Sequence, residues 1–408
     1  MEKILHNALF GSNELKKEAR EEIYKKAKES GIYPASIKEF YKKMGSGEYS
    51  GFTVPAINIR GLTFLVAKQV FKAMKELNVG PVIFEIARSE IGYTEQEPEE
   101  YAVNILSAAI DEGYKGPVFL QGDHFQVNAK KYNENKEKEI DSLEKLIKKA
   151  IDAKFYNIDI DTSTLVDISK SDLLEQQRLN YELCAHFTKF IRKNEPKGIS
   201  VSIGGEIGEV GGKNSTKEEL EAFMDGFLKE IPEEYLSKIS VQTGTSHGGV
   251  VLPDGSIAKV AIDFETLKVL SKVSKEKYKM AGAVQHGAST LPDELFHKFP
   301  EVETAEIHLA TAFQNMMFEN KLFPADLKKE MFEYCFKNFI SEKKEKDTDE
   351  QFFYKTRKKV YGPFKKALWE MPYDFKESYA NELKVKFVFL FKQLKIENTR
   401  KFLDEIYK

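Results

Sequence analysis

Eight short apolar runs recur along the chain, and stretches with helical spacing of apolar residues separate them. This alternation constrains the fold most, because continuous hydrophobicity is typical of parallel strands that are buried on both faces. Eight β–α units in succession predict an α/β protein with a closed (β/α)8 barrel, and an open doubly wound sheet is the alternative. The predicted strands are FTVPAIN (52–58), GPVIFEIA (80–87), GPVFLQGDH (116–124), FYNIDID (155–161), ISVSIGGE (199–206), KISVQTGT (238–245), MAGAVQH (280–286) and TAEIHLA (304–310).

Helical segments flank the predicted barrel on both sides. The segment before it contains NELKKEAREEIYKKAKES, and the segment after it is rich in Phe, Tyr and Lys. We therefore expect an N-terminal helical segment (1–50), a catalytic barrel (51–320) and a helical C-terminal extension (321–408).

The composition argues against several classes of function. A net charge of −3 gives no field that would gather nucleic acid or an anionic membrane. No apolar run approaches the roughly 18 residues that a membrane-spanning helix needs, and the N-terminus lacks the apolar core of a signal peptide. The two cysteines, Cys184 and Cys335, lie in helix-like stretches and indicate no disulfide framework, so we expect a cytoplasmic protein.

Chemically active side chains gather where the predicted strands end, which is where barrel enzymes carry their chemistry. The chain has seven histidines, and four of them fall at these ends. A lone histidine is more often structural, but three imidazoles with one open coordination position form a catalytic zinc site. The strand-end residues are Asn58, Arg88, Asp123, His124, Asp161, Glu206, His247, His286 and His308.

Acidic and small residues complete this picture. Asp123 adjoins a candidate ligand and could move a proton, while Asp161 and Glu206 could orient the histidines or act as ligands themselves. The last two strands lead into small residues (287–289 and 310–311), and loops at these places in barrels often bind phosphate through backbone N–H groups.

The strand-end residues also limit how the protein could break a carbon–carbon bond. Breaking a carbon–carbon bond beside a carbonyl leaves a carbanion, which needs a lysine Schiff base or a metal ion as electron sink. No predicted strand ends in lysine, so the sequence supports the metal route.

Three motifs then point to a family. GDH (122–124), GTSHGGV (244–250) and HGASTLPDEL (286–295) resemble, in this order, segments of the class II fructose- and tagatose-bisphosphate aldolases. PAIN (55–58) extends the resemblance, which covers residues 50 to 318.

The resemblance implies a set of roles for individual residues. Zinc or another divalent transition metal would bind His124, His247 and His286, with a monovalent cation near the phosphate site. Asp123 would be the acid/base group on the substrate hydroxyl, with Glu206 near the metal as a second catalytic residue. The residues implied for substrate and phosphate binding are Asn58, Gly248, Gly287, Ser289, His308 and Thr311.

Some positions depart from the family pattern. Ala288 and Thr290 replace glycines of the third motif, and His308 stands where many members have Asn. Lys213 and Asn214 occupy a loop in which members carry acidic residues, one of them the proton-abstracting base. The candidates to replace that base are Glu209, Glu218 and Glu219.

The sequence thus predicts a zinc-dependent class II aldolase that cleaves a ketose bisphosphate, such as fructose 1,6-bisphosphate, to dihydroxyacetone phosphate and an aldehyde. We expect the protein to bind a phosphorylated sugar as its substrate. We also expect it to form a homo-oligomer. GYT (92–94), Asn128 and the long extension also resemble the accessory subunit of tagatose-bisphosphate aldolase, so a non-catalytic stabilising subunit is the alternative. Metal-assisted hydrolysis is a third interpretation, which leaves the phosphate loops unexplained.

Overall fold

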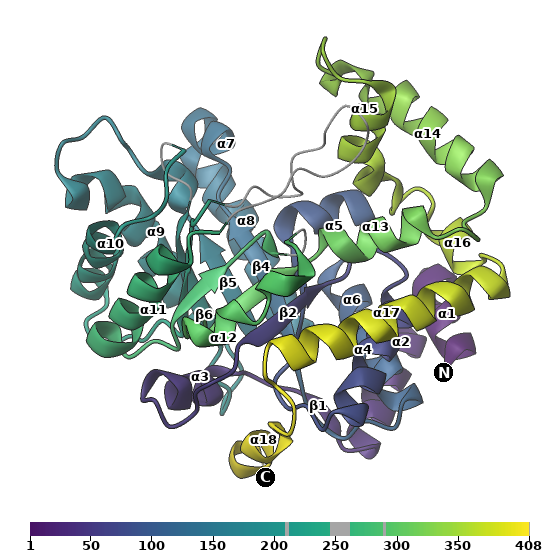
Figure 1. The fold of residues 1–408 in the computed structure, drawn as a ribbon, viewed down its shortest axis with the longest axis horizontal. Coiled ribbons are helices and arrows are strands. Elements are labelled where there is room, and N and C mark those ends of the chain that lie inside the picture. The colour runs from purple at the N-terminus through teal and green to yellow at the C-terminus, as the bar shows by residue number, and fades with distance from the viewer. Residues whose placement is uncertain (209–211, 245–261, 289–290, 408) are drawn as a thin grey trace.

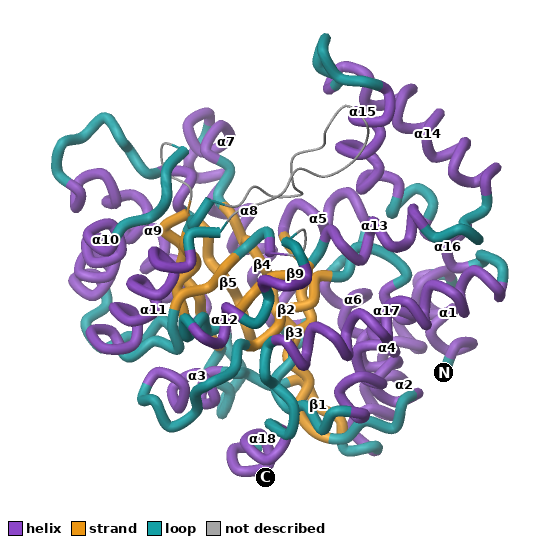
Figure 2. Tube along the Cα trace, in the orientation of Figure 1, coloured by secondary structure: helices purple, strands orange, loops and turns teal. Residues whose placement is uncertain are grey.

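Eight parallel strands close into a barrel in the computed structural model, which describes residues 1–208, 212–244, 262–288 and 291–407. Each strand pairs with the next along the chain, and β9 pairs with β2 to close the ring (Figures 1 and 2). The predicted barrel is therefore confirmed, and the alternative of an open sheet is wrong. The strands are β2 (Val54–Asn58), β3 (Ile83–Ala87), β4 (Gly116–Gln126), β5 (Asn157–Asp161), β6 (Ser202–Gly208), β7 (Lys238–Val241), β8 (Ala283–Gln285) and β9 (Glu306–Leu309).

Helices surround the strands, as Figure 2 shows. In α8, Leu143, Ile147 and Ile151 recur every fourth residue and are buried, which gives the helix one apolar face toward the barrel. The side chain of Asn135 caps the first turn of this helix by accepting from the amide of Lys138. The helices between the strands are α4 (Thr63–Glu76), α5 (Arg88–Thr94), α6 (Pro98–Asp111), α7 (Ala129–Glu134), α8 (Lys136–Asp152), α9 (Leu173–Asn194), α10 (Lys217–Glu230), α11 (Phe264–Tyr278) and α12 (Lys298–Glu301).

The N-terminal segment packs on the outside of the barrel, with α1 and α2 against α6. It holds α1 (Glu2–Phe10), α2 (Asn13–Glu29) and α3 (Lys38–Gly45), together with the short strand β1 (Ile32–Pro34), which the sequence analysis did not predict. Strand β1 pairs in parallel with the first residues of β4, outside the ring of eight. From α3, the buried hydroxyl of Tyr41 reaches the carboxylate of Glu306 inside the barrel.

Helices after β9 fold back over the barrel. They are α13 (Thr311–Glu319), α14 (Ala325–Phe339), α15 (Asp349–Thr356), α16 (Lys365–Trp369), α17 (Tyr373–Gln393) and α18 (Arg400–Ile406). The long helix α17 packs against α4 and α13, and α18 packs against α3 (Figure 1). The 3-10 turn η5 (Arg357–Val360) lies against α5, the helix that begins at the C-terminal end of β3. Within the described part of the chain, no helix combines the length and the apolar character that crossing a bilayer requires.

The barrel interior is charged, although most barrels fill this space with branched apolar residues. The ammonium of Lys238, whose side chain is 1% exposed, lies 2.9 Å from Asp159 Oδ2 and 2.5 Å from Glu306 Oε1. It also donates to the side-chain oxygen of Gln121, at 2.9 Å. Burial lowers the pKa of Lys238, but the two carboxylates outweigh burial and raise that pKa, so the side chain is a cation. An ammonium engaged in this way is not available as a Schiff-base amine, which agrees with the metal route.

Replacing Lys238 by Met tests this charged interior. Removing one partner of a buried ion pair leaves uncompensated charge, so Lys238→Met should lower the free energy of unfolding by about 3–5 kcal/mol in urea titrations. Lys272→Met, at an exposed lysine 3.9 Å from Glu276, is the control and should change stability little. Equal stability of the two variants would mean that the interior ion pairs contribute nothing.

Candidate active site

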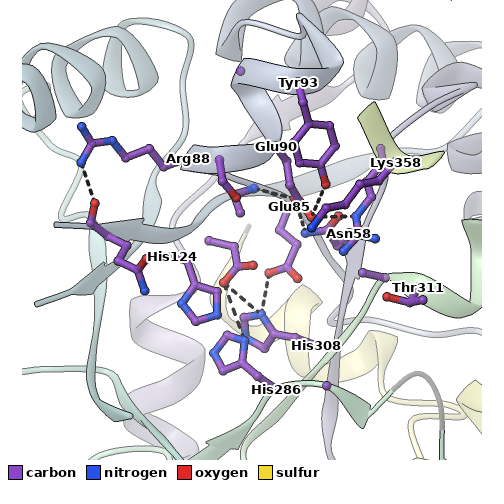
Figure 3. Close-up of a pocket in the computed structure, with 18 of the residues that line it drawn as sticks. Asn58, Glu85, Arg88, Glu90, Tyr93, His124, His286, His308, Thr311 and Lys358 are labelled. Carbon is purple, nitrogen blue, oxygen red and sulfur yellow. Dashed lines mark hydrogen bonds and ion pairs between the residues drawn. The ribbon is translucent and has the colours of Figure 1, made fainter. Parts of the chain in front are cut away.

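A pocket of about 570 Å³ opens at the C-terminal ends of the strands. Polar side chains from β2, β3, β4 and β9 point into it (Figure 3). Its lining includes Asn58, Arg60, Glu85, Glu90, Tyr93, Asp123, His124, His286, Gly287, His308, Thr311 and Lys358.

A β-bulge in β4 explains the GDH motif. The pairing of β4 with β5 shifts register between Gly122 and Phe125, and His124 has a positive φ of 40°. A bulge places an extra residue in one strand and redirects its side chains, so that Asp123 and His124 both line the pocket despite being consecutive. A Cβ on Gly122 would lie 2.5 Å from the ring of Phe125, so only glycine fits at that position.

His124 meets two carboxylates. Its Nδ1 atom is 3.1 Å from Asp161 Oδ2 and 3.1 Å from Glu206 Oε2. Burial lowers the pKa of His124, but the charges of Asp123 and Glu206 and the hydrogen bonds with Asp161 and Glu206 outweigh it and raise that pKa well above its ordinary value. Burial, together with the charge of Asp161, raises the pKa of Glu206 to about 7. The carboxylates around His124 therefore outnumber its single positive charge, and this excess of negative charge attracts cations.

His286 lies beside His124. The two ring centroids are 4.1 Å apart, and His286 Nε2 is 3.1 Å from the hydroxyl of Ser240. Ligand atoms of His124, Glu206 and His286 all lie within 4.8 Å of one another. Two imidazoles and a carboxylate fit a zinc-like ion. His247, the third predicted ligand, lies outside the described residues.

His308 occupies an unexpected environment. It lines the pocket, but its side chain is only 5% exposed and lies among carboxylates of the barrel interior. His308 Nδ1 is 3.0 Å from Glu85 Oε2 and 3.3 Å from Asp123 Oδ1, and Nε2 is 2.7 Å from Glu306 Oε1. The resemblance gave no expectation of this carboxylate shell.

The predicted substrate-binding residues are partly gathered here. Gly287, with a positive φ of 68°, and Thr311, at the start of α13, line the pocket with Asn58. The amide of Asn58 donates to Glu90 Oε2 at 2.6 Å. Gly248 and Ser289, like the candidate base Glu209, lie outside the described residues.

Two residues singled out in the sequence, Arg88 and Glu219, form structural contacts. Arg88 lines the pocket, but its guanidinium binds Glu139 at 2.6 Å and the carbonyl of Gln126 at 2.6 Å. Glu219 forms a capping box with Thr216 at the start of α10 and pairs with Lys213 at 2.9 Å, so this candidate base already has a structural role.

The sequence analysis missed two cations of the pocket wall. Arg60 pairs with Glu90 at 2.7 Å, whereas Lys358 forms no ion pair with any residue that the structure describes. Burial, followed by the charge of Arg60, lowers the pKa of Lys358. Lys358 comes from η5, far along the chain from any strand, and its ammonium is 5.6 Å from the ring centroid of Tyr93 (Figure 3). No motif in the linear sequence signals its position.

Residues 36–371 match the family model described as fructose-bisphosphate aldolase class-II. The chain belongs to the class II fructose-bisphosphate aldolase family. The family resemblance seen in the sequence motifs is thus confirmed. A search of curated proteins found no match.

Solved structures show the same fold at low sequence identity. A fructose-bisphosphate aldolase from Campylobacter jejuni is 18% identical with a TM-score of 0.52, covering 90% of this chain and 97% of that one. A protein from Sinorhizobium meliloti described as a probable tagatose 6 phosphate kinase is 14% identical with a TM-score of 0.60 (85% and 100% covered). The fructuronate-tagaturonate epimerase UxaE from Cohnella laeviribosi is 12% identical with a TM-score of 0.58 (89% and 83%).

Substituting Gly122 tests whether the bulge positions the site. Gly122→Ala should displace Asp123 and His124, because the new Cβ would overlap the ring of Phe125. We expect divalent-metal affinity, measured by calorimetry, to fall at least about 10-fold, with a stability loss of about 1–3 kcal/mol from overpacking. The double variant Gly122→Ala/Phe125→Leu relieves the overlap and should recover part of the metal affinity. Unchanged affinity in the single variant would refute the positioning role.

Proposed function

We propose that this protein is a metal-dependent class II aldolase that cleaves a phosphorylated ketose reversibly to dihydroxyacetone phosphate and an aldehyde. The observation that carries the proposal is the group of His124, Glu206 and His286 in the barrel pocket of a chain that belongs to this family. Zn²⁺ is the ion we propose, with His247 as the third histidine ligand. We also expect a homo-oligomer, and a monovalent cation near the phosphate site.

A bound divalent ion would supply a Lewis acid that withdraws electrons from the ketone of the substrate. We assign the transfer of the proton of the C4 hydroxyl to Asp123. Its Oδ1 atom lies between the imidazoles, 3.3 Å from His308 Nδ1 and 3.9 Å from His286 Nδ1. As the bond between C3 and C4 breaks, its electron pair stays with the ketone fragment and the C4 oxygen becomes the carbonyl of the aldehyde. Asp123 accepts the proton that this oxygen loses.

Two sets of groups in the pocket wall suit anionic parts of a substrate. Gly287 and the N-terminus of α13 at Thr311 offer backbone N–H groups to the phosphate nearer the metal, together with Gly248 and Ser289. The second set is cationic: Lys358 and Arg60 offer charged groups, and Lys358 forms no ion pair with a described carboxylate. We therefore propose that Lys358 binds the second phosphate of a ketose bisphosphate, while Asn58 contacts the sugar.

A panel of phosphorylated ketoses, assayed for release of triose phosphate, tests the reaction. His124→Ala and His286→Ala should each lose bound metal and at least about 99% of activity while the circular dichroism spectrum stays native, because catalysis by the metal requires both ligands. His186→Ala is the matched control, since His186 is an exposed histidine that pairs with Glu144 at 2.8 Å. Wild-type protein that holds no metal and cleaves no ketose of the panel would refute the aldolase and favour the stabilising-subunit alternative.

Lys358→Met tests the second phosphate contact. A charge-assisted hydrogen bond is worth about 1.5–3 kcal/mol, so KM for the best bisphosphate should rise about 10- to 150-fold. The KM for the matching ketose 1-phosphate should stay the same. Lys366→Met, at an exposed lysine in α16 that lies 3.8 Å from Glu370, is the control. A parallel rise for both substrates would show that Lys358 does not read the second phosphate.

A further inference from the structure

The turn η5 carries two consecutive cations that face different cavities. Lys358 lines the active-site pocket, whereas Arg357 lines a second hollow of about 450 Å³ between α13, α14 and α15. Figure 1 shows α14 and α15 standing away from the barrel, and both helices pack on η5. Because Arg357 does not line the active-site pocket, any effect that it has on a substrate must act through a neighbouring residue.

The guanidinium of Arg357 joins three elements of the C-terminal extension, and the residue is only 6% exposed. It donates to the side-chain oxygen of Asn315, in α13, at 2.6 Å. Asn315 in turn donates to the hydroxyl of Tyr354, in α15, at 3.0 Å. The guanidinium carbon lies 4.3 Å from the ring centroid of Tyr354 and 4.8 Å from that of Phe318, which are distances of cation–π contacts. The turn η5 is thus held to α13 and α15 at one point.

This contact fixes geometry more than it neutralises charge. The carboxylate of Glu319 is 3.8 Å from the guanidinium of Arg357, and the side chain of Glu319 is 66% exposed. An ion pair with so exposed a partner contributes little to stability. Arginine suits the role of a link, because its planar group can donate to an amide oxygen while its faces lie against aromatic rings.

Helix α13 is the fixed member of the link. It packs against α17, from which the hydroxyl of Tyr379 donates to the carbonyl of Phe313 at 2.9 Å. The same helix begins at Thr311, about one turn before Asn315. Arg357 therefore ties η5 to the helix whose N-terminus we assign to the phosphate nearer the metal.

The residues after η5 are held by α5. The backbone amide of Gly362 donates to the carbonyl of Tyr93 at 3.2 Å. Arg357 is the first residue of η5, so Lys358 lies between the contact with α13 and the contact with α5. A lysine side chain is flexible, but here its backbone is fixed on both sides.

We propose that Arg357 is a positioning residue for substrate selection. It fixes η5 against α13, so that Lys358 stands at the distance from Thr311 that the two phosphates of a ketose bisphosphate span. The inference rests on the proposed function, because it takes the second phosphate as the ligand of Lys358. Groups that are already fixed at this separation favour a bisphosphate over a monophosphate, since little ordering is left to be done on binding.

A double-mutant cycle on the full-length protein tests the inference. Arg357→Met should raise KM for the bisphosphate at least about 5-fold, with kcat and KM for the matching ketose 1-phosphate unchanged. In the Lys358→Met background, the same substitution should change KM for the bisphosphate less than about 2-fold, because its effect passes through the absent ammonium. Asn315→Ala, which removes the acceptor of Arg357, should show the same selective rise. Arg178→Met, at an exposed arginine 3.4 Å from Glu175, is the control.

Hydrogen exchange gives a second readout that does not need turnover. The amide of Gly362 reports whether η5 stays on α5, because it donates to Tyr93. In Arg357→Met, a peptide covering residues 357–364 should exchange at least about 5-fold faster, while peptides of the barrel strands exchange as in wild type.

The outcomes separate this inference from the proposed function. Unchanged exchange in that peptide, additive KM changes in the cycle, or an equal rise of KM for both substrates would each overturn the positioning role of Arg357. A Lys358→Met variant with the KM of wild type would instead refute the contact of Lys358 with the second phosphate. Faster exchange in Arg357→Met would then still show that Arg357 fixes η5.

Discussion

The ammonium of Lys238 is the contact on which the interior of this barrel depends. It holds Asp159 from β5, Gln121 from β4 and Glu306 from β9 at one point, and so ties together strands from different sides of the ring. The same carboxylate of Glu306 contacts His308 on the next inward-facing position of β9. The polar interior is therefore continuous with the pocket. A barrel filled with apolar side chains would have no charged groups below the histidines of the pocket.

The barrel was readable from the sequence because each of its strands is buried on both faces. The run at 80–87 and, after Thr304, the run at 304–310 are apolar apart from the inward-facing Glu85 and the pair Glu306 and His308. Those exceptions belong to the polar interior, but a single glutamate in an apolar run gives no sign of which residues it will meet. Strand β1 escaped prediction for a different reason. It is three residues long and pairs outside the ring, so neither length nor two-sided burial marks it.

The residues of the site could be predicted where they belong to a local sequence motif. They could not be predicted where they come from a segment distant in the sequence. Asp123 and His124 are adjacent in sequence, and His286 follows a strand, so strand-end reasoning brought them together. Strand-end reasoning also placed His308 at the pocket, but it could not foresee that Glu85, two positions before the end of β3, would contact its ring. Lys358 depends on the packing of η5 against α5, which is a tertiary contact without a sequence pattern.

The position of Lys358 also bears on how the molecule is made. Every barrel strand is translated before this lysine, and so are all the histidines that line the pocket. Helix α17, which covers α4, is translated later still. A ring of eight strands can thus close on the ribosome while one wall of its pocket is missing and an apolar face of an early helix is bare. The pocket therefore gains the ammonium of Lys358 only after its histidines and all eight barrel strands have been made.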